Sequence, residues 1–184
     1  MKTKRKKMNV RQLTVCAMLT ALGVIFLGIG SLLEVLDISM AVIASICVII
    51  TVIEYGKGAP WMVFAATAIL SFLLIPNKLP SIFYTLFFGF YPIIKEFLEK
   101  KKVYTGKVLC WLIKEIIFNI CLAVILCLYF LLFFQNELIF PIPTHWLIVI
   151  VVLLCEGIFI LYDIALTKMI TFYVIKLRHR FKLK

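Results

Sequence analysis

Six long apolar stretches separated by short polar segments are the feature that most constrains this chain. Of its 184 residues 64% are hydrophobic and the mean hydropathy is +1.12, more than the core of a soluble domain requires. Apolar stretches approaching ~20 residues are long enough to cross a bilayer as helices, in which all backbone groups pair internally. Residues 40–53 also lack the alternation of a barrel strand. The expected spans are 12–33, 36–53, 60–76, 79–95, 108–135 and 146–175.

Positive charges fall on one side of the zigzag that these spans predict. Of 20 Lys and Arg residues, 17 lie before the first span, after the second, between the fourth and fifth, or after the sixth. The opposite side has Lys78 alone, and Lys114 and Lys168 lie inside spans. The positive-inside rule then places both termini in the cytoplasm. We expect an all-α integral membrane protein, a compact bundle of six transmembrane helices in a single domain, 1–184.

The net charge of +11 is explained by this topology. Basic inner loops are attracted to anionic membrane lipid, so lipid is the expected charged partner and no nucleic acid is needed. The uneven distribution of charge therefore indicates orientation, in a bacterial cell membrane, rather than a polyanionic ligand.

Spans two to four are short for a bilayer. A helix of about 16 residues reaches ~24 Å, whereas the hydrocarbon core is ~30 Å thick. Local thinning of the bilayer accommodates such a helix, and a half-inserted hairpin over 36–76 is the alternative. Both interpretations stay open from the sequence.

The cysteines and the absence of catalytic motifs argue against an enzyme. All six cysteines fall within apolar spans and none forms a CxxC pair, so we expect buried thiols that pack as small apolar groups. The sequence contains no phosphate-binding loop, no HExxH and no GxSxG pattern. We expect no catalysis, no metal and no cofactor.

A row of small residues follows one face of the first span: Thr14, Ala17, Ala21 and Gly28. Faces of this kind allow close approach of helix backbones in lipid. Spacing alone is consistent with packing inside the bundle and with docking of another membrane protein.

Ionisable residues inside the last two spans are costly in lipid and are therefore informative. The fifth span carries Lys114 and Glu115, and the sixth carries Asp163 and Lys168. Pairing of Lys114 with Asp163, or of Glu115 with Lys168, would neutralise charge where desolvation is severe. We interpret these four as structural intramembrane charges.

Four other residues are candidates for lining a ligand site. Glu156 lies deep in the sixth span with no cation expected at its depth, and Asn119 lies near the middle of the fifth. Tyr84, near the outer end of the fourth span, and Trp146, after the outer segment 135–145, are aromatic residues near the outer face. An aromatic interface belt is the alternative for the last two.

In length, number of spans, cytoplasmic termini and basic amino terminus, the chain resembles the substrate-binding (S) components of energy-coupling factor (ECF) transporters. The most specific residues are Ala17-Met-Leu-Thr-Ala21, which match the AxxxA motif of that family. The resemblance implies that Ala17 and Ala21 pack against a transmembrane scaffold protein. It also implies capture of a vitamin-like small molecule in an outer pocket, and transport powered by two ATPase subunits.

Two alternatives account for the same features. A non-transport membrane scaffold of the MreD type, which organises cell-wall synthesis, would have the same size and topology without catalytic motifs. A small membrane enzyme or stand-alone carrier would use Glu156 or Asp163 as a proton site. An enclosed polar outer pocket would favour the S component over the scaffold.

Overall fold

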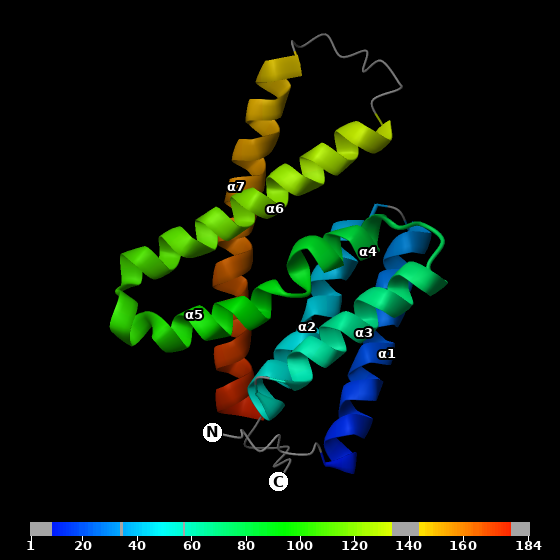
Figure 1. Cartoon of the computed structure of the whole chain (residues 1–184), viewed down its shortest axis with the longest axis vertical. Coiled ribbons are helices and arrows are strands. Elements are labelled where there is room, and N and C mark those ends of the chain that lie inside the picture. Colours follow the sequence, from blue (N-terminus) through cyan, green and yellow to red (C-terminus); the bar gives the residue numbers. More distant parts are fainter. Residues whose placement is uncertain (1–8, 34, 57, 134–143, 178–184) are drawn as a thin grey trace, which may run out of the picture. The chain divides into compact units, whose positions relative to one another are not determined.

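The structure is a computed structural model of the whole chain (Figure 1). It describes residues 9–33, 35–56, 58–133 and 144–177. The side chains are described for these residues apart from 101–105, 107, 128–133, 144–148, 176 and 177. The outer segment 135–145 noted in the sequence therefore lies almost wholly outside the described residues.

Every regular element in the described ranges is helical, which confirms the all-α prediction. Within the described residues, five helical segments are long and apolar enough to cross a membrane, which is compatible with a multi-pass membrane protein. The segment expected as a third span is a shorter apolar helix. The elements are α1 (Val10–Leu33), α2 (Asp37–Tyr55), α3 (Ala59–Leu74), α4 (Leu79–Phe83), η1 (Tyr84–Phe88), α5 (Tyr91–Thr105), α6 (Lys107–Phe133), α7 (Thr144–Phe172) and η2 (Tyr173–Leu177).

The helices form two compact units, Met1–Lys114 and Glu115–Lys184, and each is described by itself. The first contains α1 to α5 and the beginning of α6. The second contains the rest of α6, with α7 and η2. A single transmembrane domain over 1–184 stays a prediction.

In the first unit, α1, α2 and α3 pack side by side (Figure 1). Three of the buried hydroxyl groups in α2 and α3, those of Ser45, Thr51 and Ser71, are satisfied within their own helices. Ser45 donates to the carbonyl of Val42 at 2.6 Å, and Thr51 donates to that of Val48 at 2.7 Å. Such bonds to the preceding turn leave the hydroxyls needing no partner from a neighbouring helix.

Small residues bring α1 close to its neighbours. A Cβ atom on Gly23 would lie 3.1 Å from the Thr67 side chain of α3, and one on Gly30 would lie 2.9 Å from Met40 of α2. The buried residues of α1 are Cys16, Leu19, Thr20, Gly23, Leu27, Gly30 and Ser31. This packing face differs from the row of small residues that the sequence suggested.

The segment expected as the fourth span is irregular. A π-helical turn, η1, separates α4 from α5, and the Gly89 N–H donates to the Tyr84 carbonyl at 2.7 Å. Pro92 lies in the first turn of α5, where the missing N–H costs no helical hydrogen bond. The helix continues to Thr105, so the inner connection expected at 96–107 is largely helical.

The π turn creates a tight site at Gly89. A Cβ atom there would lie 2.6 Å from the Phe64 ring and 2.9 Å from the ring of Tyr84, which is fully buried. At Gly28 nothing lies within 4 Å of such an atom. Gly89 follows η1 with helical backbone angles and Gly28 lies within α1, so the two glycines form a matched pair for testing this packing.

We predict that Gly89→Ala destabilises the protein by about 1–3 kcal/mol, because the added methyl group overpacks the ring cluster. Gly28→Ala should be neutral or slightly stabilising, since alanine favours helix. Thermal unfolding of both variants in detergent measures the difference. Equal stability of the two variants would contradict the described packing around η1.

Candidate functional site

The second unit holds the polar residues that the sequence singled out, and an aromatic pair positions them. The rings of Phe118 on α6 and Phe159 on α7 stack with centroids 4.4 Å apart. Leu122, Tyr162 and Leu166 are also buried. Spaced three or four residues apart along each helix, these side chains form apolar stripes. The stripes bring the neighbouring polar residues of α6 and α7 into reach of one another.

Asn119 and Glu156 lie together. The Asn119 amide donates to Glu156 Oε1 at 2.9 Å and to the backbone carbonyl of Glu115 at 3.1 Å. An amide NH₂ group has two hydrogens, so both bonds form at once. Asn119 thereby orients the Glu156 carboxyl group across the two helices, and two separate sequence candidates form one cluster.

Glu115 completes this cluster. Its carboxyl group lies within hydrogen-bonding distance of the Glu156 carboxyl group. The Oε2 atoms of both residues are buried and accept no hydrogen bond from any described donor. We call Glu115, Asn119 and Glu156 the carboxyl cluster.

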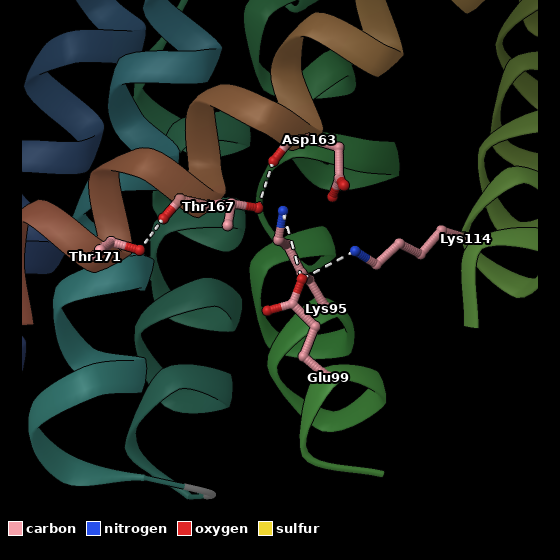
Figure 2. Close-up of polar contacts among 6 residues, drawn as sticks. All are labelled: Lys95, Glu99, Lys114, Asp163, Thr167 and Thr171. Atoms are coloured by element: carbon pink, nitrogen blue, oxygen red, sulfur yellow. Dashed lines mark hydrogen bonds and ion pairs between the residues drawn. The ribbon is translucent and has the colours of Figure 1, made fainter. Parts of the chain in front are cut away.

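Other charged residues of the second unit lie along α7. The Thr167 hydroxyl donates to the Asp163 carbonyl at 2.9 Å, and the Thr171 hydroxyl donates to that of Thr167 at 2.8 Å (Figure 2). Lys168 lines an open groove of about 570 Å³ together with Thr167, Thr171, Phe172 and Ile175. The described residues contain no group of three or more His, Cys, Asp or Glu placed to hold a metal ion.

Two buried lysines of the first unit share one carboxylate. Lys114 Nζ lies 3.0 Å from Glu99 Oε1, and Lys95 Nζ lies 3.8 Å from the same atom (Figure 2). The Lys95 side chain is 0% exposed and that of Lys114 is 8% exposed. The contact joins α5 to the start of α6 across the turn at Gly106, whose φ of 81° is left-handed.

The described contacts bear on only some of the ion pairs that we expected from depth along the fifth and sixth spans. Lys114 has Glu99 as a partner, and its pairing with Asp163 stays a prediction. Glu115 lies against Glu156, and the described part of the second unit contains no ion pair between Glu115 and Lys168. Asp163 and Lys168 both lie on α7, as the sequence indicated.

The two aromatic candidates are not part of the carboxyl cluster as described. Tyr84 belongs to the first unit, where its ring is fully buried and lies 5.9 Å from the ring of Phe64. Trp146 lies in the first turn of α7, and its side chain is outside the described set. Their role in ligand binding stays a prediction.

Ala17 and Ala21 occupy an exposed position on α1. They line an open, almost wholly apolar groove of about 320 Å³ between α1 and α3. The remaining lining residues are Leu13, Cys16, Thr20, Met62, Val63, Ala66 and Leu70. Within the first unit the two alanines are thus not used for helix packing.

Sequence reasoning missed Glu99 and Lys95 because it assigned both ends of the 95–107 segment to an inner loop. Their spacing of four residues predicts a helical ion pair once that segment is helical. The sequence also gave no sign that Glu156 has a neighbouring acid, because only cations at matching depth were considered as its partners.

Comparison of the chain with protein-family models, with curated proteins and with solved structures found no match.

We predict that Glu99→Gln destabilises the protein by about 2 kcal/mol or more, because it removes a charged acceptor from two buried lysines. Glu96→Gln is the matched control. Glu96 pairs with Lys100, whose side chain is 63% exposed, so its loss should cost less than about 1 kcal/mol. Urea or thermal unfolding in detergent compares the two. A larger loss in Glu96→Gln would contradict the described burial.

Proposed function

We propose that this chain is a six-span membrane protein with both termini in the cytoplasm, and that it is the substrate-binding component of an ECF-type importer. It takes up a vitamin or similar micronutrient at the outer face. A transmembrane scaffold and two ATPases then drive release inside. The chain itself carries out no chemistry.

The orientation is supported by the distribution of charge. Seventeen of 20 Lys and Arg residues lie on one side of the expected zigzag, which the positive-inside rule assigns to the cytoplasm. The apolar helices described above are compatible with several membrane crossings. The short helix α3 crosses fully in this proposal, with local thinning of the bilayer.

The observation that carries the importer proposal is the position of Ala17 and Ala21. Both are exposed and line an apolar groove, while α1 uses Gly23 and Gly30 for its own close packing. A small-residue face that the first unit leaves exposed allows the backbone of another helix to approach closely in lipid. This arrangement supports the role that the AxxxA resemblance implies for the two alanines.

The proposed ligand contacts begin with Asn119 and Glu156, because a hydrogen bond already joins them across two helices. An amide and a carboxyl group together offer a donor and acceptors to a polar solute. Tyr84 and Trp146 are the proposed aromatic contacts, chosen for their expected position near the outer face.

Purification of the full chain from its native membrane in mild detergent tests the proposal. We expect mass spectrometry to identify a transmembrane scaffold and two ATPases in the eluate, and a vitamin-like small molecule released on denaturation. Recovery of cell-wall synthesis proteins, with no ATPase, would instead favour a scaffold of the MreD type.

We predict that Ala17→Leu and Ala21→Leu each reduce recovery of the scaffold and ATPases by about tenfold or more. The added branches occupy the groove, and overpacking of about 1–3 kcal/mol corresponds to such a loss. Binding of the small molecule should be unchanged. Ala123→Leu is the matched control, since Ala123 is exposed on α6 outside the groove. Normal assembly of both groove variants would refute the coupling role.

A stand-alone proton-coupled carrier is the second candidate, and the carboxyl cluster is the observation that favours it. Two carboxyl groups in contact on apolar helices are suited to binding and releasing protons. This candidate predicts that Glu156→Gln abolishes uptake in vesicles that contain only this chain. An S component is inactive in such vesicles, with or without the substitution.

A further inference from the structure

The carboxyl cluster contains a contact that requires an explanation. Glu115 of α6 and Glu156 of α7 bring two carboxyl groups within hydrogen-bonding distance. The Oε2 atom of each is buried and receives no hydrogen bond from a described donor. Two ionised carboxylates have only acceptors, so they repel each other and leave these atoms unsatisfied.

The surrounding groups of the second unit do not relieve this repulsion. Asn119 donates to Glu156 Oε1 and leaves both Oε2 atoms without a donor. Cys155 and Asp163 are the other titratable groups that interact with the pair, and neither supplies a positive charge. Lys114 precedes Glu115, but its ammonium group contacts Glu99. Lys168 is exposed, and the described side chains of the second unit form no ion pair between it and either glutamate.

We infer that Glu115 and Glu156 share one proton, so that the carboxyl cluster is a proton-binding site joining α6 to α7. The proton lies between the two carboxyl groups as an O–H···O hydrogen bond. The pair then carries one negative charge in place of two, and each buried oxygen gains a partner. Sharing of this kind is the established consequence of placing two carboxyl groups in contact.

The third member of the cluster fixes the geometry of the shared bond. Asn119 holds the Glu156 carboxyl group through Oε1 and is itself anchored to the backbone carbonyl of Glu115. Rotation of the Glu156 carboxyl group is therefore restricted, and its Oε2 atom is left without a described donor. Asn119 is a positioning residue for the proton site.

Loss of the proton has a structural consequence. Without it, two adjacent negative charges on α6 and α7 repel across the contact that Phe118 and Phe159 form. We expect the packing of these two helices to weaken when both carboxyl groups are ionised. The inference does not depend on the proposed transport function.

Infrared spectroscopy of the full-length protein in lipid nanodiscs tests the inference. A protonated carboxyl group gives a carbonyl-stretch band that is separate from the amide bands and shifts in D₂O. At neutral pH we expect this band in the wild type. We expect it to be lost in Glu115→Gln and in Glu156→Gln, because the new amide donates a hydrogen bond to the remaining carboxylate.

Control variants locate the proton. Glu96→Gln and Asp163→Asn should both keep the band. Absence of the band from the wild type, or its persistence in Glu115→Gln and Glu156→Gln, would overturn a shared proton. Loss of the band in Asp163→Asn alone would assign the proton to a different residue.

A third variant tests the inference even if the glutamine variants fail to fold. Asn119→Ala removes the donor to Glu156 Oε1 and keeps both carboxyl groups. We expect the band to remain and to move to higher frequency, because the carbonyl loses a hydrogen bond. An unchanged frequency would show that Asn119 does not hold the protonated pair.

Discussion

The constraint on which this structure depends is the cost of leaving a polar group unsatisfied away from water. Apolar helices satisfy their backbones internally, and buried hydroxyls such as Ser45 and Thr51 donate to their own helix. The packing of α1 against its neighbours then depends on how well the helix surfaces fit together. Gly23 and Gly30 make this fit possible by allowing the backbones to approach closely. Some polar residues instead join two helices: Asn119 donates to Glu156, and Lys114 pairs with Glu99.

Small residues on α1 have two different positions: some pack within the first unit and others line an exposed groove. Gly23 and Gly30 face α3 and α2 within the first unit, whereas Ala17 and Ala21 line an exposed groove. In the sequence both sets have helical spacing and small side chains, so spacing alone left packing and docking both open. Only the rotation of α1 about its axis separates them. That rotation is set by contacts with residues such as Thr67 and Met40, far away in the sequence.

The helical class and most helix positions could be predicted from the sequence, because apolar length fixes them with little help from tertiary contacts. The irregular stretch at Tyr84–Phe88 could not, since a π turn depends on how Gly89 fits against Phe64 and Tyr84. The helical segment after Tyr91 was missed for a related reason. Its lysines were expected to lie in a polar loop, but the Lys95 side chain is buried and lies against Glu99.

The carboxyl cluster shows why depth alone is a weak guide to partners inside apolar helices. Glu156 had no cation expected at its depth, which made it a candidate for lining a ligand site. On a helix, however, the residues that a side chain contacts depend on its angular position around the axis as well as on its depth along it. Near the stacked Phe118 and Phe159 rings, the residues on the facing side of α6 are Glu115 and Asn119. An acid can therefore be satisfied by a second acid, provided that a proton makes up the missing donor.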